Sequence, residues 1–340
     1  MYDEDITSIV EEIGRLKLYM DGCYLVTGGT GFIGSYIIRT LLFYTKKGSN
    51  IKVIAPVRNI KKARKMFGSL PNLIFVPWEM EHELIVDEHI DYVIHAASPV
   101  GATYFLTNPY DTMKQNLLGC IHIIHLCKRI YPQKIVYIGS ASSYGNKICR
   151  ETNEPISEEL LGDFRSMNKN ESYSISKLGV EYLLACASEQ LKIQTMVVRL
   201  FSVYGPGMDF TNGSVTTDLF RQAIYSDQLI IKGNGVPVRN FGYITDIISG
   251  VFIVLHRGST GEAYNLGSMT ENYSIYDFAK HIRSHLLKPT ELIVSDLEKG
   301  RIIQNSMQIP ELKKANSLGW QSYISLDCGI RKILKFYKTI

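Results

Sequence analysis

Residues 24–34 read Tyr-Leu-Val-Thr-Gly-Gly-Thr-Gly-Phe-Ile-Gly, with Gly28, Gly31 and Gly34 spaced as G-x-x-G-x-x-G. An apolar run precedes these glycines, and residues 35–42 follow with apolar side chains at helical spacing. This order predicts a strand, a tight glycine turn and a helix. Glycine lets the backbone turn sharply and approach a pyrophosphate, while a helix N-terminus offers free N–H groups and a partial positive charge. Because both flanks fit, the stretch predicts dinucleotide binding rather than a purely structural turn.

The bulk composition is typical of a globular protein. A chain of 340 residues can bury a large core, and its net charge of +4, with no basic run denser than residues 61–65, does not favour nucleic acid as a partner. The six cysteines are scattered without a C-x-x-C pair, which predicts reduced thiols and a cytoplasmic location. The acidic start does not resemble a secretory signal, and no apolar run is long enough to predict a membrane span.

Apolar runs alternate with helical patterns through the first two thirds of the chain. We expect further strands at residues 51–58, 72–77, 91–98 and 134–139, a helix at 113–127, and a return to the sheet at 197–201 and 243–255. This alternation predicts an α/β fold with a doubly wound parallel sheet covered on both faces. Ligands of such sheets bind beyond the carboxyl ends of the strands. Residues 6–20 suit an amphipathic helix that could cap the sheet or form a dimer contact.

The end of the second expected strand carries Arg58, with Lys61 and Lys62 close behind. An acid at this place would accept from the ribose hydroxyls of NAD, whereas a cation suits the 2′-phosphate of NADP. An arginine stacked on adenine would be compatible with either cofactor, and on balance we favour NADP over NAD. The remaining cofactor-binding candidates follow strand ends or lie in the glycine turn: Phe32, Ile33, Glu79, Ala96, Ala97 and Ser98. For the neighbouring His95 we favour a hydrogen-bonded core histidine over a general base.

Three polar residues far apart in the sequence form the catalytic hypothesis. Tyr173 and Lys177 stand four residues apart at the start of an expected helix, so they share one face. A free tyrosine has a pKa near ~10 and is a poor acid or base at neutral pH, and a nearby ammonium would lower that pKa. Ser140 follows the fifth expected strand and can hydrogen-bond the same substrate oxygen. We predict that these three residues converge as a catalytic group.

At these residues the chain resembles the extended short-chain dehydrogenase/reductases, in particular the nucleotide-sugar epimerase/dehydratase group. The resemblance extends from Gly22 to Trp320 and rests on these pieces: Thr27-Gly28-Gly29-Thr30-Gly31-Phe32-Ile33-Gly34, His95-Ala96-Ala97, Asn116-Leu117-Leu118-Gly119, Ser140 with Tyr144-Gly145, Tyr173-x-x-x-Lys177, Arg199 to Gly207, Arg239 to Asp246, Tyr264 to Gly267, and Leu318-Gly319-Trp320. It implies a Rossmann domain, an NAD or NADP cofactor and a nucleotide-diphosphate-sugar substrate. It also implies a smaller C-terminal substrate-binding domain.

The resemblance also implies roles for individual residues. Tyr173 would be the catalytic acid or base, Lys177 would hold the nicotinamide ribose and tune Tyr173, and Ser140 would bond the reacting oxygen. Asn116 matches a structural asparagine behind the active site, and we count it with the cofactor-binding candidates. Arginine guanidinium groups bind phosphate oxygens well, so the resemblance assigns arginines to the diphosphate of the substrate. The substrate-binding candidates are Ser142, Ser202, Val215, Arg239 and Arg301.

Two departures from the family pattern bear on the reaction. Decarboxylases and 4,6-dehydratases carry an acid between the active-site Ser or Thr and the Tyr-Gly pair, where this chain has Ala141, Ser142 and Ser143. Ser202 stands where relatives usually have asparagine. We therefore predict a reductase acting on a nucleotide-linked sugar, with an epimerase that retains NAD as the alternative. A decarboxylase or dehydratase is less favoured, and a non-enzymatic binding protein least.

The expected organisation is a cofactor domain at residues 1–204, to which 236–262 return, and a mainly substrate-binding domain at 205–340. The resemblance implies a homodimer formed through two helices, here residues 116–129 and 174–189. These helices could instead simply pack on the sheet. The histidines and cysteines lack ligand spacing, so we expect no metal site.

Overall fold

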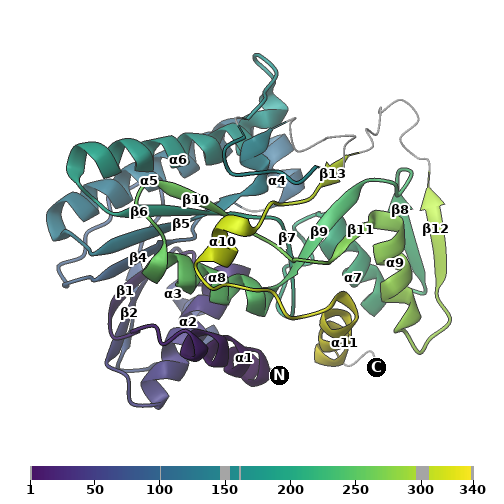
Figure 1. Cartoon of the computed structure of the whole chain (residues 1–340), viewed down its shortest axis with the longest axis horizontal. Helices are drawn as coiled ribbons and strands as arrows, with labels where there is room; N and C mark the ends of the chain where they lie inside the picture. The colour runs from purple at the N-terminus through teal and green to yellow at the C-terminus, as the bar shows by residue number, and fades with distance from the viewer. Residues whose placement is uncertain (1, 100, 146–153, 161, 296–305, 338–340) are drawn as a thin grey trace.

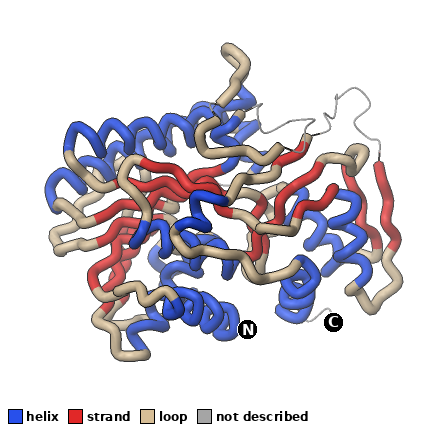
Figure 2. Tube along the Cα trace, viewed as in Figure 1, coloured by secondary structure: helices blue, strands red, loops and turns tan. Residues whose placement is uncertain are grey.

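The computed structural model describes residues 2–99, 101–145, 154–160, 162–295 and 306–337. Figure 1 shows two parts side by side, a large sheet with helices on both faces and a smaller group of short strands with its own helices. In Figure 2 the strands of the large sheet run together as one layer between helical layers. The described residues include no helix with the length and apolar character that crossing a membrane requires.

Seven parallel strands of the described chain form the large sheet, in the spatial order β10, β6, β5, β4, β1, β2, β3. They are β1 (Gly22–Thr27), β2 (Ile51–Val57), β3 (Leu73–Pro77), β4 (Tyr92–His95), β5 (Lys134–Ser140), β6 (Thr195–Leu200) and β10 (Glu262–Leu266). The strands are mostly apolar because both faces of the sheet are covered, and every residue of β4 is buried. The predicted doubly wound parallel sheet is confirmed.

Helices cover the two faces of this sheet (Figure 1). One face carries α4 (Ala102–Thr107), α5 (Pro109–Ile130) and α6 (Ser172–Leu191). The other carries α1 (Tyr2–Arg15), α2 (Phe32–Lys46), α3 (Ile60–Phe67) and α8 (Ile244–Arg257). The helix expected at residues 6–20 is α1, and it packs against α8 and α2 of its own chain. It therefore adds to the helical layer rather than standing free.

The strand order fixes where a ligand can bind. From β1 the chain moves outward to β2 and β3, then returns to place β4 on the other side of β1. The connections after β1 and β4 therefore diverge to opposite faces and leave a crevice at the carboxyl ends of these two strands. The glycine turn follows β1 and the small residues Ala96 and Ala97 follow β4, so both border that crevice.

The smaller part consists of two further sheets and the helices packed on them. One sheet contains β7 (Ser202–Tyr204), β9 (Val238–Tyr243), β11 (Asn272–Ser274) and β13 (Met307–Gln308), and the other pairs β8 (Gln228–Lys232) with β12 (Glu291–Ser295). The helices are α7 (Val215–Tyr225), α9 (Ile275–Ser284) and α11 (Leu326–Phe336), whereas α10 (Lys313–Ser317) packs against β10 of the large sheet. Residues 236–262 were expected to return to the cofactor domain. Within them, α8 covers the large sheet, but β9 belongs to the smaller part. The strand β10 completes the large sheet, whereas the sequence analysis assigned residues from 263 onward to the substrate-binding domain. The division at residue 204 itself stays a prediction.

A buried carboxylate joins the two parts of the molecule. Asp5 of α1 is 1% exposed and accepts hydrogen bonds from the Tyr36 hydroxyl of α2 at 3.1 Å and the Tyr243 hydroxyl of β9 at 3.1 Å. The ammonium of Lys332 in α11 pairs with it at 2.8 Å. Because three donors from distant segments meet one buried charge, removing that charge leaves all three without their partner.

We expect Asp5→Ala to lower the free energy of unfolding by about 3 kcal/mol, the cost of breaking a buried ion pair and its hydrogen bonds. Urea titration followed by circular dichroism measures this change. Asp3→Ala is the matched control, because Asp3 lies exposed in the same first turn. A loss no larger than that of Asp3→Ala would show that the buried carboxylate does not join the two parts.

Candidate active site

A cavity of about 750 Å³ lies at the carboxyl ends of β1 and β4. The glycine turn forms its floor, with Gly28, Gly31 and Gly34 among the lining residues. Phe32 and Ile33, the first residues of α2, also line it, as the sequence predicted. No side chain caps α2, since its N-cap residue is Gly31, so the first-turn N–H groups are available to an anion in the cavity.

The backbone packing at this turn requires glycine. Gly28 has φ +68°, and a Cβ on it would lie 2.6 Å from the Ala96 carbonyl oxygen. A Cβ on Gly34 would lie 2.3 Å from the Gly28 carbonyl oxygen. Side chains at either place would push the turn away from β4 or from α2. The turn therefore has the close backbone approach that a dinucleotide pyrophosphate site needs.

Two cations stand at the far end of the cavity. Arg58, directly after β2, and Lys62, in the first turn of α3, both line it, and both side chains are exposed. The Asn59 side chain caps α3 by accepting from the Lys62 N–H at 2.9 Å, which fixes the start of that helix. Glu79 is exposed and does not line the cavity, although its neighbours Trp78 and Met80 do.

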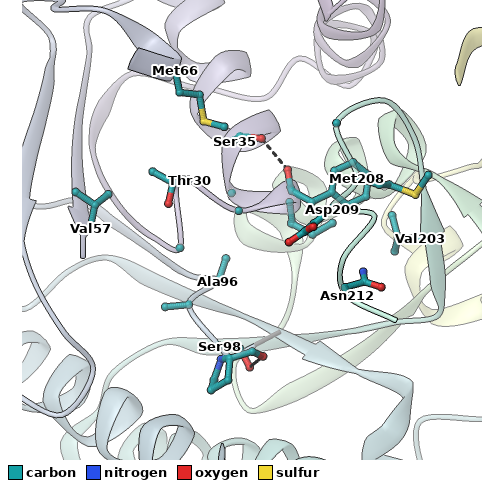
Figure 3. Close-up of a pocket in the computed structure, with 18 of the residues that line it drawn as sticks. Thr30, Ser35, Val57, Met66, Ala96, Ser98, Val203, Met208, Asp209 and Asn212 are labelled. Carbon is teal, nitrogen blue, oxygen red and sulfur yellow. Dashed lines mark hydrogen bonds between the residues drawn. The ribbon is translucent and has the colours of Figure 1, made fainter. Parts of the chain in front are cut away.

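Figure 3 shows Thr30, Val57, Ala96 and Ser98 on one side of this cavity and Val203, Met208, Asp209 and Asn212 on the other. The dashed line there is the Ser35 hydroxyl bond to the Phe32 carbonyl, 2.9 Å long, inside the first turn of α2. Ala97 lines the same wall as Ala96. The second wall belongs to the smaller part of the molecule, so the cavity lies between the two parts.

Sequence reasoning did not find several of these lining residues. Tyr2 of α1 lines the cavity, and its ring packs edge-on against Tyr36 with the Arg39 guanidinium 4.5 Å above it. Met208, Asp209 and Asn212 lie after Gly207, where the quoted family piece ends, and no residue between Gly207 and Val215 had been assigned a role. Tyr2 precedes the helix expected at residues 6–20, and no sequence pattern indicated it; the structure extends that helix back to Tyr2.

His95 is a core residue, as predicted. The Thr27 hydroxyl accepts from the Ala96 and Ala97 N–H groups at 3.1 and 3.0 Å, so its own hydrogen is left for His95 Nδ1 at 2.8 Å. Burial, aided by the Lys177 ammonium, lowers the pKa of His95 to about 3. A neutral, buried imidazole of this kind holds the end of β4 and does not exchange protons at neutral pH.

The three catalytic candidates converge at the end of β5 and the start of α6. Ser140 is the last residue of β5, and its hydroxyl interacts with Tyr173. The Tyr173 ring stacks on Phe105 of α4, with centroids 4.0 Å apart and planes 11° from parallel. Burial raises the pKa of Tyr173 above its usual value, and the hydrogen bond with Ser140 opposes the rise. The phenol is therefore protonated at neutral pH, contrary to the expectation of a lowered pKa, because burial outweighs the hydrogen bond with Ser140.

Lys177 lies one turn beyond Tyr173 on α6. Its ammonium is 5.8 Å from the centre of the Tyr173 ring and donates to the Ile138 carbonyl at 3.0 Å. Burial lowers the pKa of Lys177 to about 8, and the Glu181 carboxylate, a further turn along α6, acts in the opposite direction. Glu181 is itself buried and held by Arg199 at 2.7 Å. Sequence reasoning missed this pair, although Glu181 continues the four-residue spacing of Tyr173 and Lys177.

Asn116 lies behind the site and does not line the cavity. Its buried side chain accepts from the Ser98 hydroxyl at 2.8 Å and donates to the Ser176 hydroxyl at 2.9 Å. Ser176 in turn donates to the Tyr173 carbonyl at 2.8 Å. This chain of hydrogen bonds connects the loop after β4 to the first turn of α6, so Asn116 positions Tyr173 relative to the cavity wall.

A second cavity of about 380 Å³ opens on Ser140. Ser142 and Ser202 also line it, and Ser202 lines the larger cavity as well, so the two cavities adjoin there. Val215 is the first residue of α7 and 39% exposed, while its neighbours Ser214 and Thr216 line the larger cavity.

Neither arginine candidate is among the described residues that line the two cavities. The Arg239 guanidinium donates to the hydroxyl of Ser306 at 2.9 Å and lines neither cavity. Arg301 lies outside the described residues. The substrate roles of all five candidates stay predictions.

Comparison with known proteins places the chain in a family. The model of the NAD dependent epimerase/dehydratase family matches residues 24–267. The chain belongs to this family. UDP-glucuronic acid decarboxylase 1 of Xenopus tropicalis is 26% identical over 319 residues, which cover 92% of this chain and 72% of the relative. The family's cofactor class agrees with the nicotinamide dinucleotide predicted from the glycine turn.

Solved structures of related fold support the architecture. An epimerase of Methanothermobacter thermautotrophicus superposes with a TM-score of 0.78 at 21% identity, covering 98% of this chain and 96% of the other. A dTDP-glucose 4,6-dehydratase of Bacillus anthracis, in complex with NAD, gives 0.75 at 20% identity, covering 93% and 96%. At these identities the likeness shows the fold and leaves the reaction of this family member open.

The depressed pKa of Lys177 predicts a pH dependence of stability. In the unfolded chain a lysine has a pKa of ~10.4, against about 8 in the folded protein. At a pH between these two pKa values the unfolded state binds more protons than the folded state. The stability that Lys177 contributes therefore increases with pH. We expect the free energy of unfolding of the wild type, minus that of Lys177→Met, to be constant below pH ~7 and to increase from pH ~8 to ~10.

Urea titrations at a series of pH values measure this difference. Tyrosines and cysteines are common to both proteins, so their contributions to the free energy of unfolding cancel in it. Lys169→Met, at an exposed position just before α6, is the matched control. A flat difference for Lys177→Met would contradict a buried ammonium with a depressed pKa.

Proposed function

We propose that this protein is an NADPH-dependent reductase acting on a keto sugar linked to a nucleoside diphosphate. The observation that carries the proposal is the group at the end of β5, where Ser140 faces the smaller cavity and interacts with a protonated Tyr173. A phenol that keeps its proton suits the acid of a ketone reduction. The nicotinamide, when bound, supplies hydride to the carbonyl carbon.

In this mechanism the protein's own groups handle the oxygen and its proton. The Ser140 hydroxyl hydrogen-bonds the substrate carbonyl oxygen, and Tyr173 gives its proton to that oxygen as the carbon accepts hydride. The phenolate that remains is stabilised by the Lys177 ammonium on the same helix face. Phe105, stacked on the ring, keeps water from one face of the phenol.

The segment after Ser140 supports reduction over elimination or decarboxylation. In the short helix η1 (Ala141–Tyr144) the side chains are Ala, Ser, Ser and Tyr, so no carboxylate stands beside Ser140 on this segment. Decarboxylases and dehydratases of this family use an acid there for proton transfer next to the keto group. Epimerisation does not need that acid, so an epimerase that retains NAD is the second candidate.

The cations at the far end of the large cavity support NADP over NAD. Arg58 and Lys62 both line that end, and no acid lines it among the described residues apart from Asp209 on the opposite wall. A 2′-phosphate needs such cations, whereas the ribose diol of NAD is usually held by a carboxylate.

We propose a homodimer formed through α5 and α6, which pack side by side within the chain. Tyr110 of α5 and Tyr182 of α6 leave large apolar rings exposed, at 73% and 58%. Exposed aromatic rings of this kind are enriched where proteins associate.

The purified enzyme should oxidise NADPH only when a 4-keto sugar linked to UDP, GDP, CDP or dTDP is added, with NADPH absorbance as the readout. Tyr173→Phe should lower the rate about 1,000-fold, because the general acid is lost, and should still bind NADPH. Tyr182→Phe is the control on the exposed side of the same helix. Tightly bound NAD with no net NADPH turnover would identify the epimerase instead. A Tyr173→Phe enzyme of wild-type rate would remove the proposed mechanism.

Arg58→Ala should weaken NADPH binding by about 10- to 100-fold, since a charge-assisted bond to the 2′-phosphate is lost, and leave NADH binding unchanged. Fluorescence titration of both cofactors measures this. Lys61→Ala removes a nearby charge that does not line the cavity and should affect neither cofactor. Equal losses for NADPH and NADH would mean that Arg58 contacts the adenine rather than the phosphate.

A further inference from the structure

The smaller cavity contains a single charged side chain among the described residues that line it. That side chain is Glu171, the last residue of the short helix η3 (Lys169–Glu171), two residues before Tyr173. The other lining groups are hydroxyls, an amide and apolar or backbone surfaces, including Ser140, Ser142, Ser174 and Gln308. A ligand in this cavity therefore meets one negative charge and no cation among the described residues that line it.

The Glu171 carboxylate is held in place by neutral donors. The backbone N–H of Arg165 donates to it at 2.9 Å, and the Asn168 side-chain amide donates at 3.1 Å. Asn168 is itself fixed, because its side-chain oxygen accepts from the Asn170 N–H at 3.2 Å. A carboxylate has about four acceptor positions, so two such bonds leave capacity for a ligand that donates. Neither bond neutralises the charge.

The position of Glu171 differs from that of the acid that the chain lacks. That acid would stand on the segment after β5, where Ser142 lines the cavity, whereas Glu171 enters from the loop that precedes α6. Both the catalytic Ser140 and Glu171 face the same 380 Å³ space, so a sugar whose reacting carbon lies at Ser140 brings its neighbouring substituents towards Glu171.

We infer that Glu171 determines substrate specificity by accepting hydrogen bonds from hydroxyl groups of a neutral sugar and by repelling a sugar that carries a carboxylate. A uronate placed here would set two negative charges together in a partly enclosed space, where no described lining cation compensates. This inference rests on the proposed binding of a nucleotide sugar in this cavity and names its sugar class. It separates this chain from its UDP-glucuronic acid decarboxylase relatives, whose names specify an acidic sugar.

Calorimetric titration of the NADPH-saturated protein tests the inference with matched pairs, UDP-glucose against UDP-glucuronate and GDP-mannose against GDP-mannuronate. The wild type should bind the neutral member of a recognised pair at least about 30-fold more tightly. Glu171→Gln should bring the two members within about 3-fold, mainly by strengthening uronate binding, and Glu171→Lys should reverse the preference. Glu159→Gln, an exposed carboxylate outside the cavity, is the matched control and should retain wild-type discrimination.

The outcomes separate this inference from the proposed function. Equal binding of both members by the wild type, or discrimination unchanged in both Glu171 variants, overturns the role of Glu171 while leaving the reductase proposal standing. Discrimination without any NADPH oxidation by keto sugars supports Glu171 and overturns the reductase. Binding of no member of either pair, together with no NADPH oxidation by any of the UDP-, GDP-, CDP- or dTDP-linked keto sugars, overturns both.

Discussion

The close approach of Gly34 to the Gly28 carbonyl oxygen is the constraint on which the site depends. There is no room for a Cβ on Gly34, since it would lie 2.3 Å from that oxygen. This closeness sets the start of α2 directly above the end of β1, so the helix N–H groups border the crevice beside β4. The neighbouring Thr27 hydroxyl extends the constraint to β4 by binding two of its following N–H groups. A rigid corner at the strand ends is what gives a dinucleotide a fixed position.

A second set of contacts positions α6 and, with it, Tyr173. Ser98, Asn116 and Ser176 form a continuous chain of hydrogen bonds to the backbone of Tyr173. Buried polar networks of this kind are costly when incomplete and rigid when satisfied. They relate the phenol to the wall of the cofactor cavity, which a solvent-exposed helix could not do. The Glu181–Arg199 pair holds the same helix one turn beyond Lys177.

The two parts of the molecule share both the cavity and the buried charge of Asp5. Residues after Gly207 supply one wall of the large cavity, and Lys332 of α11 reaches Asp5 beneath α2. The N-terminal helix α1 therefore links the large-sheet part of the molecule to the smaller part through three side-chain contacts. A movement of the smaller part would change the cavity wall. It would also strain the contacts of Asp5, because these contacts join the smaller part to α1 and α2.

The sequence by itself determined the parallel sheet and the glycine turn, and it predicted Ser140, Tyr173 and Lys177 as a catalytic group. These features depend on local patterns: apolar runs, glycines at fixed spacing and side chains one helical turn apart. It could also identify His95 as a core residue, because a histidine inside a buried strand must find a partner close by.

Only the tertiary structure decided which distant residues meet. Asp5 gave no signal in an acidic helix start, yet it is buried because Tyr36, Tyr243 and Lys332 surround it. The direction of the Tyr173 pKa followed from burial beneath Phe105, which spacing along one helix cannot reveal. Likewise, no sequence pattern indicated Glu171, and only the fold brought it into the cavity that Ser140 also lines. Burial and charge proximity are properties of three-dimensional neighbours, so a linear pattern specifies the elements but not the electrostatics where they come together.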